Sequence, residues 1–227
     1  MKLLSILFLI VFVYKALDNE NGYFIPKEFE YPSSKIDSGK TFIYQNSLTK
    51  QHSLTDLKLM NVAGKIFRTI KNYDSTGATS DSSKIYDGKA IEVYNFFMAN
   101  DGTRTKADII QDTILNDGHK LGIHLTKSIY RTKHTTNEIA SIGQYLKDTT
   151  ITWKNTLVPV LVITNNSVIE LRTNTNGIKM THTIKVFSNQ YFGQGIGLIK
   201  YSVYFKDHTG KDNYNVWDLK SIENLKK

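Results

Sequence analysis

The sequence predicts an all-β protein built on a curved antiparallel sheet, which forms a half-barrel or an open barrel with few or no helices. Composition is the first observation: the 227 residues include 24 Ile and 23 Thr but only 7 Ala and 7 Glu. β-Branched residues favour strands, whereas Ala and Glu favour helices. The other two observations are an alternation of apolar and polar residues and a series of turn signals at hairpin spacing.

Two segments show the alternation most clearly. On the first, one face carries Ile178, Met180, His182, Ile184 and Val186. On the second, one face carries Ile199, Tyr201, Val203 and Phe205. Successive side chains of a strand point to opposite faces, so each segment is predicted to be a strand with one buried apolar face and one solvent-exposed polar face. The turn signal Asp207–Gly210 predicts a hairpin that leads into Tyr214 and Val216.

Further strands are predicted between the remaining turn signals, such as Ser75–Gly77, Asp87–Gly88 and Asn165–Ser167. They cover Thr41–Gln45, Lys58–Asn72, Ala90–Met98, His119–Tyr130, Glu138–Leu146, Ile151–Asn155, Leu157–Thr164 and Ser167–Thr173. The segment Lys106–Asn116 combines helical spacing with β-branched residues, and a strand is favoured. The tail from Asp218 is predicted to form a short helix.

The predicted sheet has one apolar face that cannot stay exposed to water. The chain offers no long amphipathic helices to cover it, so the sheet is expected to curl on itself. The run Leu157–Ile163 is apolar on both faces and predicts burial on both sides, although Pro159 lacks an N–H and indicates an edge or a bulge. Whether side chains fill the concave interior or a ligand occupies it stays open at this point.

The N-terminus predicts a signal peptide over residues 1–16, because an apolar run from Leu3 to Tyr14 lies between Lys2 and Lys15. Twelve helical residues span about 18 Å, short of the ~30 Å hydrocarbon core of a membrane. The protein is therefore expected to be exported to the bacterial periplasm or the extracellular space, and to be integral to a membrane only if the leader is retained. Residues 17–39 are predicted to be an extended N-terminal segment, and residues 40–227 a single antiparallel β-domain.

The chain has no cysteine, which excludes disulfides, thiolate metal sites and a cysteine nucleophile. Its net charge is +8, or +6 without Lys2 and Lys15. This excess of basic over acidic residues favours binding to a polyanion such as anionic lipid headgroups, surface polysaccharide or nucleic acid. The cations are scattered singly along the sequence, however, so a solvated basic surface is favoured over a dedicated binding face.

Motifs of enzymes are absent. The sequence has no HExxH, no GxSxG and no P-loop, and no two of its six histidines lie four residues apart. His182 is the one histidine set in an apolar face, where it is expected either to be a buried neutral histidine or to fix a ligand headgroup. The run Gly193-x-Gly195-x-Gly197 precedes a strand rather than a helix, so it is interpreted as a site of tight bending or close backbone approach.

The run Tyr191-Phe192-Gly193-Gln194-Gly195-Ile196-Gly197-Leu198-Ile199-Lys200-Tyr201 resembles a signature near the end of exported half-barrel envelope proteins of unknown function. The opening Gly39-Lys40-Thr41-Phe42-Ile43-Tyr44 also resembles the first strand of such domains. The resemblance implies an exported protein without assigned activity, similar in architecture to the lipoprotein carriers LolA and LolB. This chain departs from the common form because it lacks a lipobox cysteine.

The favoured hypothesis is a non-catalytic exported protein that binds a lipid or another apolar or amphipathic ligand in its concave face. The residues expected to line that site are Met180, His182, Ile184, Tyr201, Val203 and Phe205. The alternative is an envelope protein that engages a polymer or a protein partner through its surface or a sheet edge. No enzymatic activity, cofactor or metal is expected. An unrecognised carboxylate-pair enzyme is the third hypothesis, and nucleic-acid binding ranks lower still.

Overall fold

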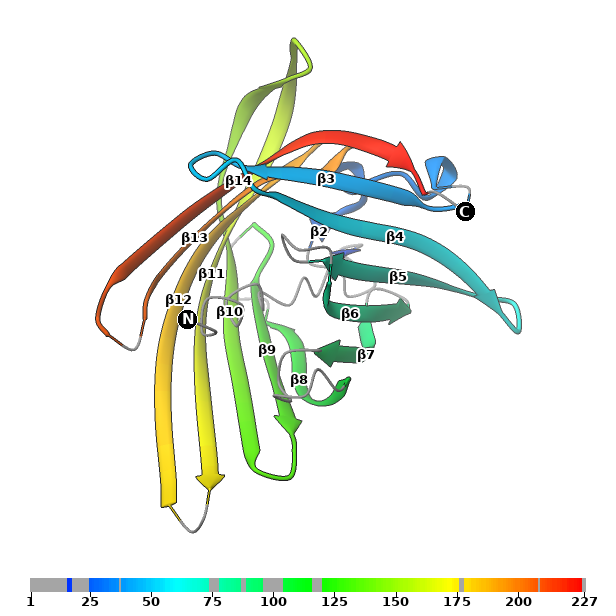
Figure 1. The fold of residues 1–227 in the computed structure, drawn as a ribbon. Helices are drawn as coiled ribbons and strands as arrows, with labels where there is room; N and C mark the ends of the chain where they lie inside the picture. The colour runs from blue at the N-terminus through cyan, green and yellow to red at the C-terminus, as the bar shows by residue number, and fades with distance from the viewer. Residues whose placement is uncertain are drawn as a thin grey trace.

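The protein is a closed antiparallel barrel of twelve strands (Figure 1). The computed structural model describes residues 16–17, 25–36, 38–73, 78–86, 89–95, 104–115, 120–175, 178–207 and 209–225. The barrel strands are β3 (Lys40–Asn46), β4 (His52–Val62), β5 (Lys65–Tyr73), β6 (Thr79–Tyr86), β7 (Lys89–Asn95), β8 (Thr105–Leu115), β9 (Ile123–Arg131), β10 (Thr135–Trp153), β11 (Thr156–Thr175), β12 (Ile178–Gly193), β13 (Gly197–Lys206) and β14 (Asp212–Asn224). The predicted all-β, antiparallel class is confirmed.

The sheet closes completely, which corrects the expected half-barrel or open barrel. Each strand pairs with the next one along the chain, and β14 then pairs with β3 from Trp217 opposite Asn46 to Asn224 opposite Lys40. This last ladder joins residues 171 to 184 positions apart, which no local pattern in the sequence reports. Closure satisfies the backbone groups that two free edge strands would expose.

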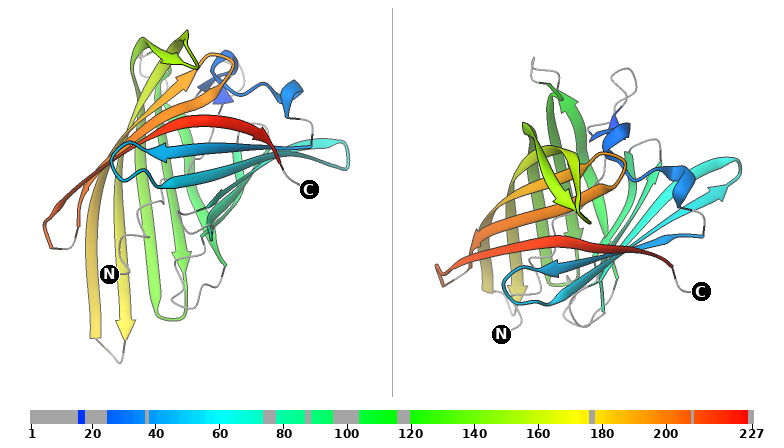
Figure 2. Two further views of the ribbon diagram at one scale, coloured as in Figure 1. Left: turned by 45° about the horizontal axis from the view of Figure 1, so that its top comes forward. Right: turned by 90° about the horizontal axis from the view of Figure 1, so that it is seen from above.

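The strands differ greatly in length, so the barrel is taller on one side. β10, β11 and β12 have 19, 20 and 16 residues and form a long wall with β9, whereas β7 has 7 residues. In Figures 1 and 2 this wall extends past the shorter strands β3 to β7. Among the described residues, β7 and β8 pair at Tyr94 opposite Lys106 and at Asn95 opposite Thr105, fewer pairs than any other two barrel strands form there.

Several predicted element boundaries are wrong, each for a local reason. Lys58–Asn72 is a hairpin rather than one strand, because the chain reverses at Ala63 and Gly64, whose φ angles are 51° and 79°. The predicted turn at Asn165–Ser167 lies inside β11, where these residues pair with β10 and β12. The predicted helix after Asp218 is the end of β14, since its residues complete the ladder that closes the barrel. Lys106–Asn116 contains strand β8, as favoured.

The register places alternate side chains in the barrel interior, where most of the core lies. Phe42, Tyr44, Leu57, Ile70 and Ile85 are buried on the inner side of β3 to β6. Of the run Leu157–Ile163, predicted to be buried on both sides, Val160–Ile163 is buried on both faces of β11, whereas Leu157 and Pro159 are exposed. Buried side chains therefore lie on the outer face of β11 as well as in the barrel interior.

The segment that precedes the barrel packs against one of its ends. It comprises β1 (Ala16–Leu17), which pairs in parallel with β2 (Ile25–Pro26), and two 3₁₀ turns, η2 (Lys27–Phe29) and η3 (Ser33–Lys35). Ile36 is completely buried. We call residues 25–36 the cap. The predicted signal peptide lies outside the described residues apart from its last position, and no helix within the described ranges is long and apolar enough to cross a membrane.

Two glycines allow the cap to approach the barrel closely, as the sequence interpretation anticipated. Gly195 has a φ of +67° and donates its N–H to the Glu28 carbonyl, with an N–O distance of 2.6 Å. Gly197 has a φ of +83°, and a Cβ added there would lie 3.2 Å from the backbone nitrogen of Tyr31. A larger residue at this position would both strain the backbone and press on the cap.

Candidate functional site

The barrel interior has an aromatic and apolar side, formed by inward side chains of β12, β13 and β14. We call it the apolar sector, and it comprises Ile184, Val186, Tyr201, Val203, Phe205 and Trp217. The Tyr201 ring stacks on the Trp217 ring with centroids 6.1 Å apart, and its edge meets the Tyr44 ring at 5.6 Å. All six side chains are buried. Four of the six predicted site residues therefore lie together here.

The other two predicted residues, Met180 and His182, share the inward face of β12 but are exposed. β13 begins to pair with β12 only at Val186, so the part of β12 before it has a partner on one side alone. That part belongs to the β11–β12 hairpin, which projects from the long wall in Figure 1. The expectation that His182 would be a buried neutral histidine is wrong, because burial depends on the neighbouring strand as well as on the apolar face.

A polar network occupies the inner side of β4, β5 and β6, and we call it the polar sector. Thr55, Asn72 and Asp81 stand opposite one another across the three strands. The Thr55 hydroxyl donates to the Asn72 carbonyl oxygen at 2.7 Å, and the Asn72 amide donates to Asp81 Oδ1 at 2.7 Å. The Ser80 hydroxyl donates to Asp81 Oδ2 at 3.1 Å.

Asp81 is the buried ionisable group at the centre of the polar sector. Burial raises its pKa from 3.8 to about 6, although the hydrogen bonds from Asn72 and Ser80 oppose the shift. This carboxyl group can therefore donate a hydrogen bond when it is protonated and accept two when it is ionised. A buried group that changes charge close to neutral pH is a candidate for binding a polar or charged group.

Asp81 also lies close to two tyrosines from the opposite part of the barrel. Burial raises the pKa values of Tyr130 on β9 and Tyr201 on β13, and the charge of Asp81 raises both further. A hydrogen bond with Ser53 lowers the pKa of Tyr201 and opposes this effect. Tyr201 thus belongs to the apolar sector through its ring and approaches the polar sector through its hydroxyl group.

A second polar pair lies further round the interior, on β8 and β9. His124 Nε2 is 2.8 Å from Asp112 Oδ1; His124 is buried and Asp112 is partly buried. His124 is not one of the residues singled out from the sequence. Among the residues that the structure describes, no three His, Asp or Glu side chains are placed to hold a metal ion.

A small cavity lies between the cap and the barrel. Its lining includes Tyr31, Phe42, Leu57, Phe192 and Leu198, and its volume is about 40 Å³. That is room for a few water molecules rather than for a lipid chain. The cap contact is therefore a packed joint rather than a site for a lipid chain.

The sequence missed the polar sector because it missed β6. The segment Thr79–Tyr86 has the composition Thr-Ser-Asp-Ser-Ser-Lys-Ile-Tyr, which has few apolar residues to reveal alternation. The signal that could have found it is spacing, since the segment has strand length and lies between the turn signals Ser75–Gly77 and Asp87–Gly88. Its inward residues Asp81 and Ser83 are buried by the strands on either side.

Comparison with known proteins identifies similarity of structure alone. No protein-family model and no curated protein matches the chain. A candidate lipoprotein from Parabacteroides distasonis matches with a TM-score of 0.46 and 10% identity, covering 86% of this chain and 98% of that one. A candidate exported protein with a YmcC-like fold from Bacteroides fragilis matches with a TM-score of 0.48 and 10% identity, covering 86% and 99%. A likeness this distant carries no argument about ligand, activity or location.

Proposed function

We propose that the protein is a non-catalytic exported barrel that binds a lipid or another amphipathic ligand in its interior. The observation that carries the proposal is the division of one interior into the apolar sector and the polar sector. An apolar chain would lie against the Tyr201 and Trp217 rings and Val203, and a polar headgroup would lie near Asp81 and Asn72.

The number of strands supports this proposal. Eight-stranded barrels are just wide enough to be filled by side chains or to hold one small ligand, whereas barrels of 16 to 18 strands enclose an aqueous channel. A barrel of twelve strands lies between these classes. Several of its inward residues are small, which leaves more of the cross-section to an occupant; these are Ser53, Ser83, Ala107, Ser141, Ser167 and Ser188.

Export is the part of the proposal that rests on the sequence. The apolar run Leu3–Tyr14 predicts a leader, and the glycine run Gly193–Gly197 resembles exported envelope proteins. An architecture of the LolA and LolB kind would place the ligand site on the concave side of the sheet. In this closed barrel, that side is the interior with its two sectors.

The first experiment is native mass spectrometry of the protein, followed by organic extraction. We expect the native mass to exceed the mass of the denatured protein by that of a bound amphipathic molecule. The organic solvent should extract this molecule. For affinity, the protein is titrated with cis-parinaric acid, a fluorescent fatty acid, and energy transfer from tryptophan is measured. Val186→Phe adds bulk to the apolar sector and is expected to weaken binding at least tenfold, whereas Lys185→Phe on the outer face of the same strand is the matched control.

Failure of Val186→Phe to fold, checked by its thermal melt, would leave Val203→Phe as the second variant in the apolar sector. A protein without an extractable ligand that also fails to bind the fatty acid would contradict the proposal. Equal loss of binding in Val186→Phe and Lys185→Phe would also contradict it, because the probe would then lie on the outer surface.

A further inference from the structure

The outer face of β4 to β8 gathers cations that are scattered in the sequence. We call this face the basic wall, and it comprises Lys58, Lys65, Lys71, Lys84, Arg104 and Lys106. Antiparallel pairing brings them together; for example, Lys71 and Lys106 both lie on the row that passes through Ser82 and Tyr94. Asp56, Glu92 and Asp108 are the described acidic residues on the same face of these strands. Asp56 and Glu92 stand opposite Lys71 and Lys84, and Asp108 forms an ion pair with Arg131 of β9.

The cations of the basic wall differ in their contacts from those of the opposite walls. None of the six forms an ion pair with a residue that the structure describes. On the other walls, ion pairs neutralise many cations: Lys120–Asp148, Lys127–Glu138, Arg131–Asp108, Arg172–Glu170, Lys200–Asp218 and Lys206–Asp212. The positive charge of the basic wall therefore stays available to an external anion.

Aromatic rings lie among these cations. Lys84 Nζ is 4.5 Å from the centroid of the Phe67 ring, and Lys65 Nζ is 5.2 Å from that of Tyr86. The two rings are themselves 5.1 Å apart. A lysine ammonium group held over an aromatic ring places its charge beside an apolar surface, an arrangement also favoured at the membrane interface.

The β4–β5 hairpin adds an exposed apolar tip to the basic wall. Met60, Val62 and Ile66 are 43%, 44% and 61% exposed, and they adjoin the turn at Ala63 and Gly64. In Figures 1 and 2 this hairpin projects away from the barrel. Met60 and Val62 share the outer face with Lys65 and Phe67, whereas Ile66 lies on the opposite face of the hairpin. Exposed apolar side chains beside a lysine at a projecting tip suit a boundary between an apolar phase and an anionic one.

We propose that the β4–β5 hairpin and the basic wall dock the protein on an anionic lipid bilayer. The tip residues Met60, Val62 and Ile66 enter the boundary between headgroups and acyl chains, while the lysines contact the anionic headgroups. An acidic polysaccharide or a nucleic acid would use the lysines but would offer no apolar phase to the tip. The apolar tip is therefore the feature that favours a membrane over another polyanion.

The test is cosedimentation of the full chain with vesicles of phosphatidylcholine and of phosphatidylcholine with phosphatidylglycerol in equal parts. We expect binding to the anionic vesicles that weakens as salt is added. Lys58→Glu with Lys65→Glu is expected to reduce this binding by about tenfold or more, since each lysine near the surface contributes several-fold. Lys179→Glu with Lys185→Glu makes the same change in charge at exposed lysines of β12 and is expected to have a smaller effect.

A second measurement separates docking by the hairpin from insertion of an apolar leader. Because the chain has no cysteine, Val62→Cys can carry a single environment-sensitive dye. Its emission is expected to rise and shift to the blue with anionic vesicles, whereas the same dye on Thr181→Cys of β12 is expected to stay unchanged. The paired substitution Met60→Gln with Val62→Gln, which keeps every charge, is expected to weaken binding to vesicles but not to dextran sulfate.

Three results would overturn the inference. The first is absence of binding to anionic vesicles, and the second is an unchanged dye signal at position 62 or an equal change at position 181. The third is a pattern of vesicle binding in which both charge-reversed pairs weaken binding equally and the pair Met60→Gln with Val62→Gln does not weaken it. That pattern would show that the protein binds polyanions in general. Each result is independent of whether the barrel interior holds a ligand.

Discussion

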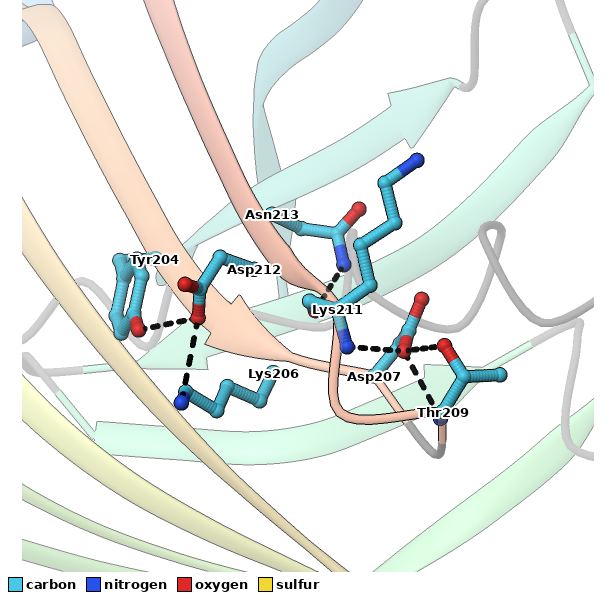
Figure 3. Close-up of polar contacts among 7 residues, drawn as sticks. All are labelled: Tyr204, Lys206, Asp207, Thr209, Lys211, Asp212 and Asn213. Carbon is cyan, nitrogen blue, oxygen red and sulfur yellow. Dashed lines mark hydrogen bonds and ion pairs between the residues drawn. The ribbon is translucent and has the colours of Figure 1, made fainter.

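Asp81 illustrates how single residues decide the chemistry of the interior. An ionised carboxylate loses hydration when it is buried, and two neutral hydrogen-bond donors compensate only in part, so its pKa rises. The exposed Asp207 shows the opposite case in the β13–β14 turn (Figure 3). It accepts the N–H groups of Thr209 and Lys211 at 2.9 and 3.0 Å and the Thr209 hydroxyl at 2.6 Å, which lower its pKa to about 2.

Asp81→Asn is expected to change how stability depends on pH. The pKa of Asp81 is about 6 in the folded protein and 3.8 without the fold, so the folded state binds more protons between these values. The unfolding free energy contributed by Asp81 therefore falls as the pH rises from 3.8 to about 6, by about 3 kcal/mol in total. Urea unfolding across this range measures the difference between wild type and Asp81→Asn, which is expected to widen in favour of the variant.

The exposed carboxylate variant Glu223→Gln is the control, and its difference from wild type is expected to stay small over the same range. A constant difference between wild type and Asp81→Asn from pH 4 to pH 7 would contradict the assignment of a raised pKa to Asp81.

Gly197→Ala is expected to destabilise the protein more than Gly195→Ala. Both glycines have positive φ, so each substitution costs about 1 kcal/mol of backbone strain. Only at Gly197 would the new Cβ meet the backbone of Tyr31, since nothing lies within 4 Å of a Cβ at Gly195. Urea midpoints of the two variants measure the difference, and equal midpoints would show that the cap does not depend on this close approach.

At the scale of elements, two kinds of joint hold the barrel together. Strand ladders give the first, and they range from the long pairing of β10 with β11 to the two residue pairs between β7 and β8. The second kind of joint is formed by the cap. Its Tyr31 ring contacts Phe42 on β3, its Glu30 pairs with Arg68 on β5, and the Glu28 carbonyl accepts the Gly195 N–H of the turn before β13. The cap therefore connects strands that are distant in sequence.

Arg68→Met is expected to cost about 2 kcal/mol of unfolding free energy, because it leaves the Glu30 carboxylate buried without its partner. Arg68 Nη1 lies 2.9 Å from Glu30 Oε2, and Glu30 Oε1 has no hydrogen-bond partner among the described residues. The double variant Glu30→Gln with Arg68→Met removes the charge as well and is expected to recover part of the loss. Chemical unfolding at neutral pH compares the two, and a double variant less stable than the single one would contradict this account.

At the scale of the whole molecule, closure creates an inside and an outside with different compositions. The inside combines the apolar sector with the polar sector, and the outside combines paired charges with the basic wall. Neither arrangement is visible in any one strand, because each is assembled across four or more strands. Both proposals therefore depend on strand order and register more than on local sequence.

Binding of an anionic amphiphile in the interior is expected to depend on pH through Asp81. Above its pKa of about 6 the ionised carboxylate repels an anionic headgroup, and below that value the protonated form can donate a hydrogen bond to it. Parinaric acid should therefore bind more tightly at pH 5 than at pH 7.5, and the change in affinity should be smaller for Asp81→Asn. Titration of the probe itself affects both proteins equally, so the difference between them reports Asp81 alone. An identical pH profile for both proteins would place the headgroup away from the polar sector.

Much of the fold could be predicted from sequence where the apolar pattern was strong. The alternation in β12 and β13 and the turn signal before β14 predicted this part of the sheet, and they placed Ile184, Tyr201, Val203 and Phe205 on one face. The prediction failed for Met180 and His182 because exposure there depends on where β13 ends, next to Val186. It also failed for β6, whose polar residues show no alternation although two strands bury its inner face.

By itself, the sequence determined the all-β class, the positions of most strands and the glycines that admit the cap, since these follow from local side-chain size, polarity and backbone freedom. The tertiary structure alone decided that the sheet closes, because the ladder between β3 and β14 joins the first and last strands of the barrel, which are far apart in sequence. It also decided that Asp81 lies in the same interior as Tyr201 and that separate lysines form one wall. Those are consequences of register, which fixes which residues of neighbouring strands stand side by side.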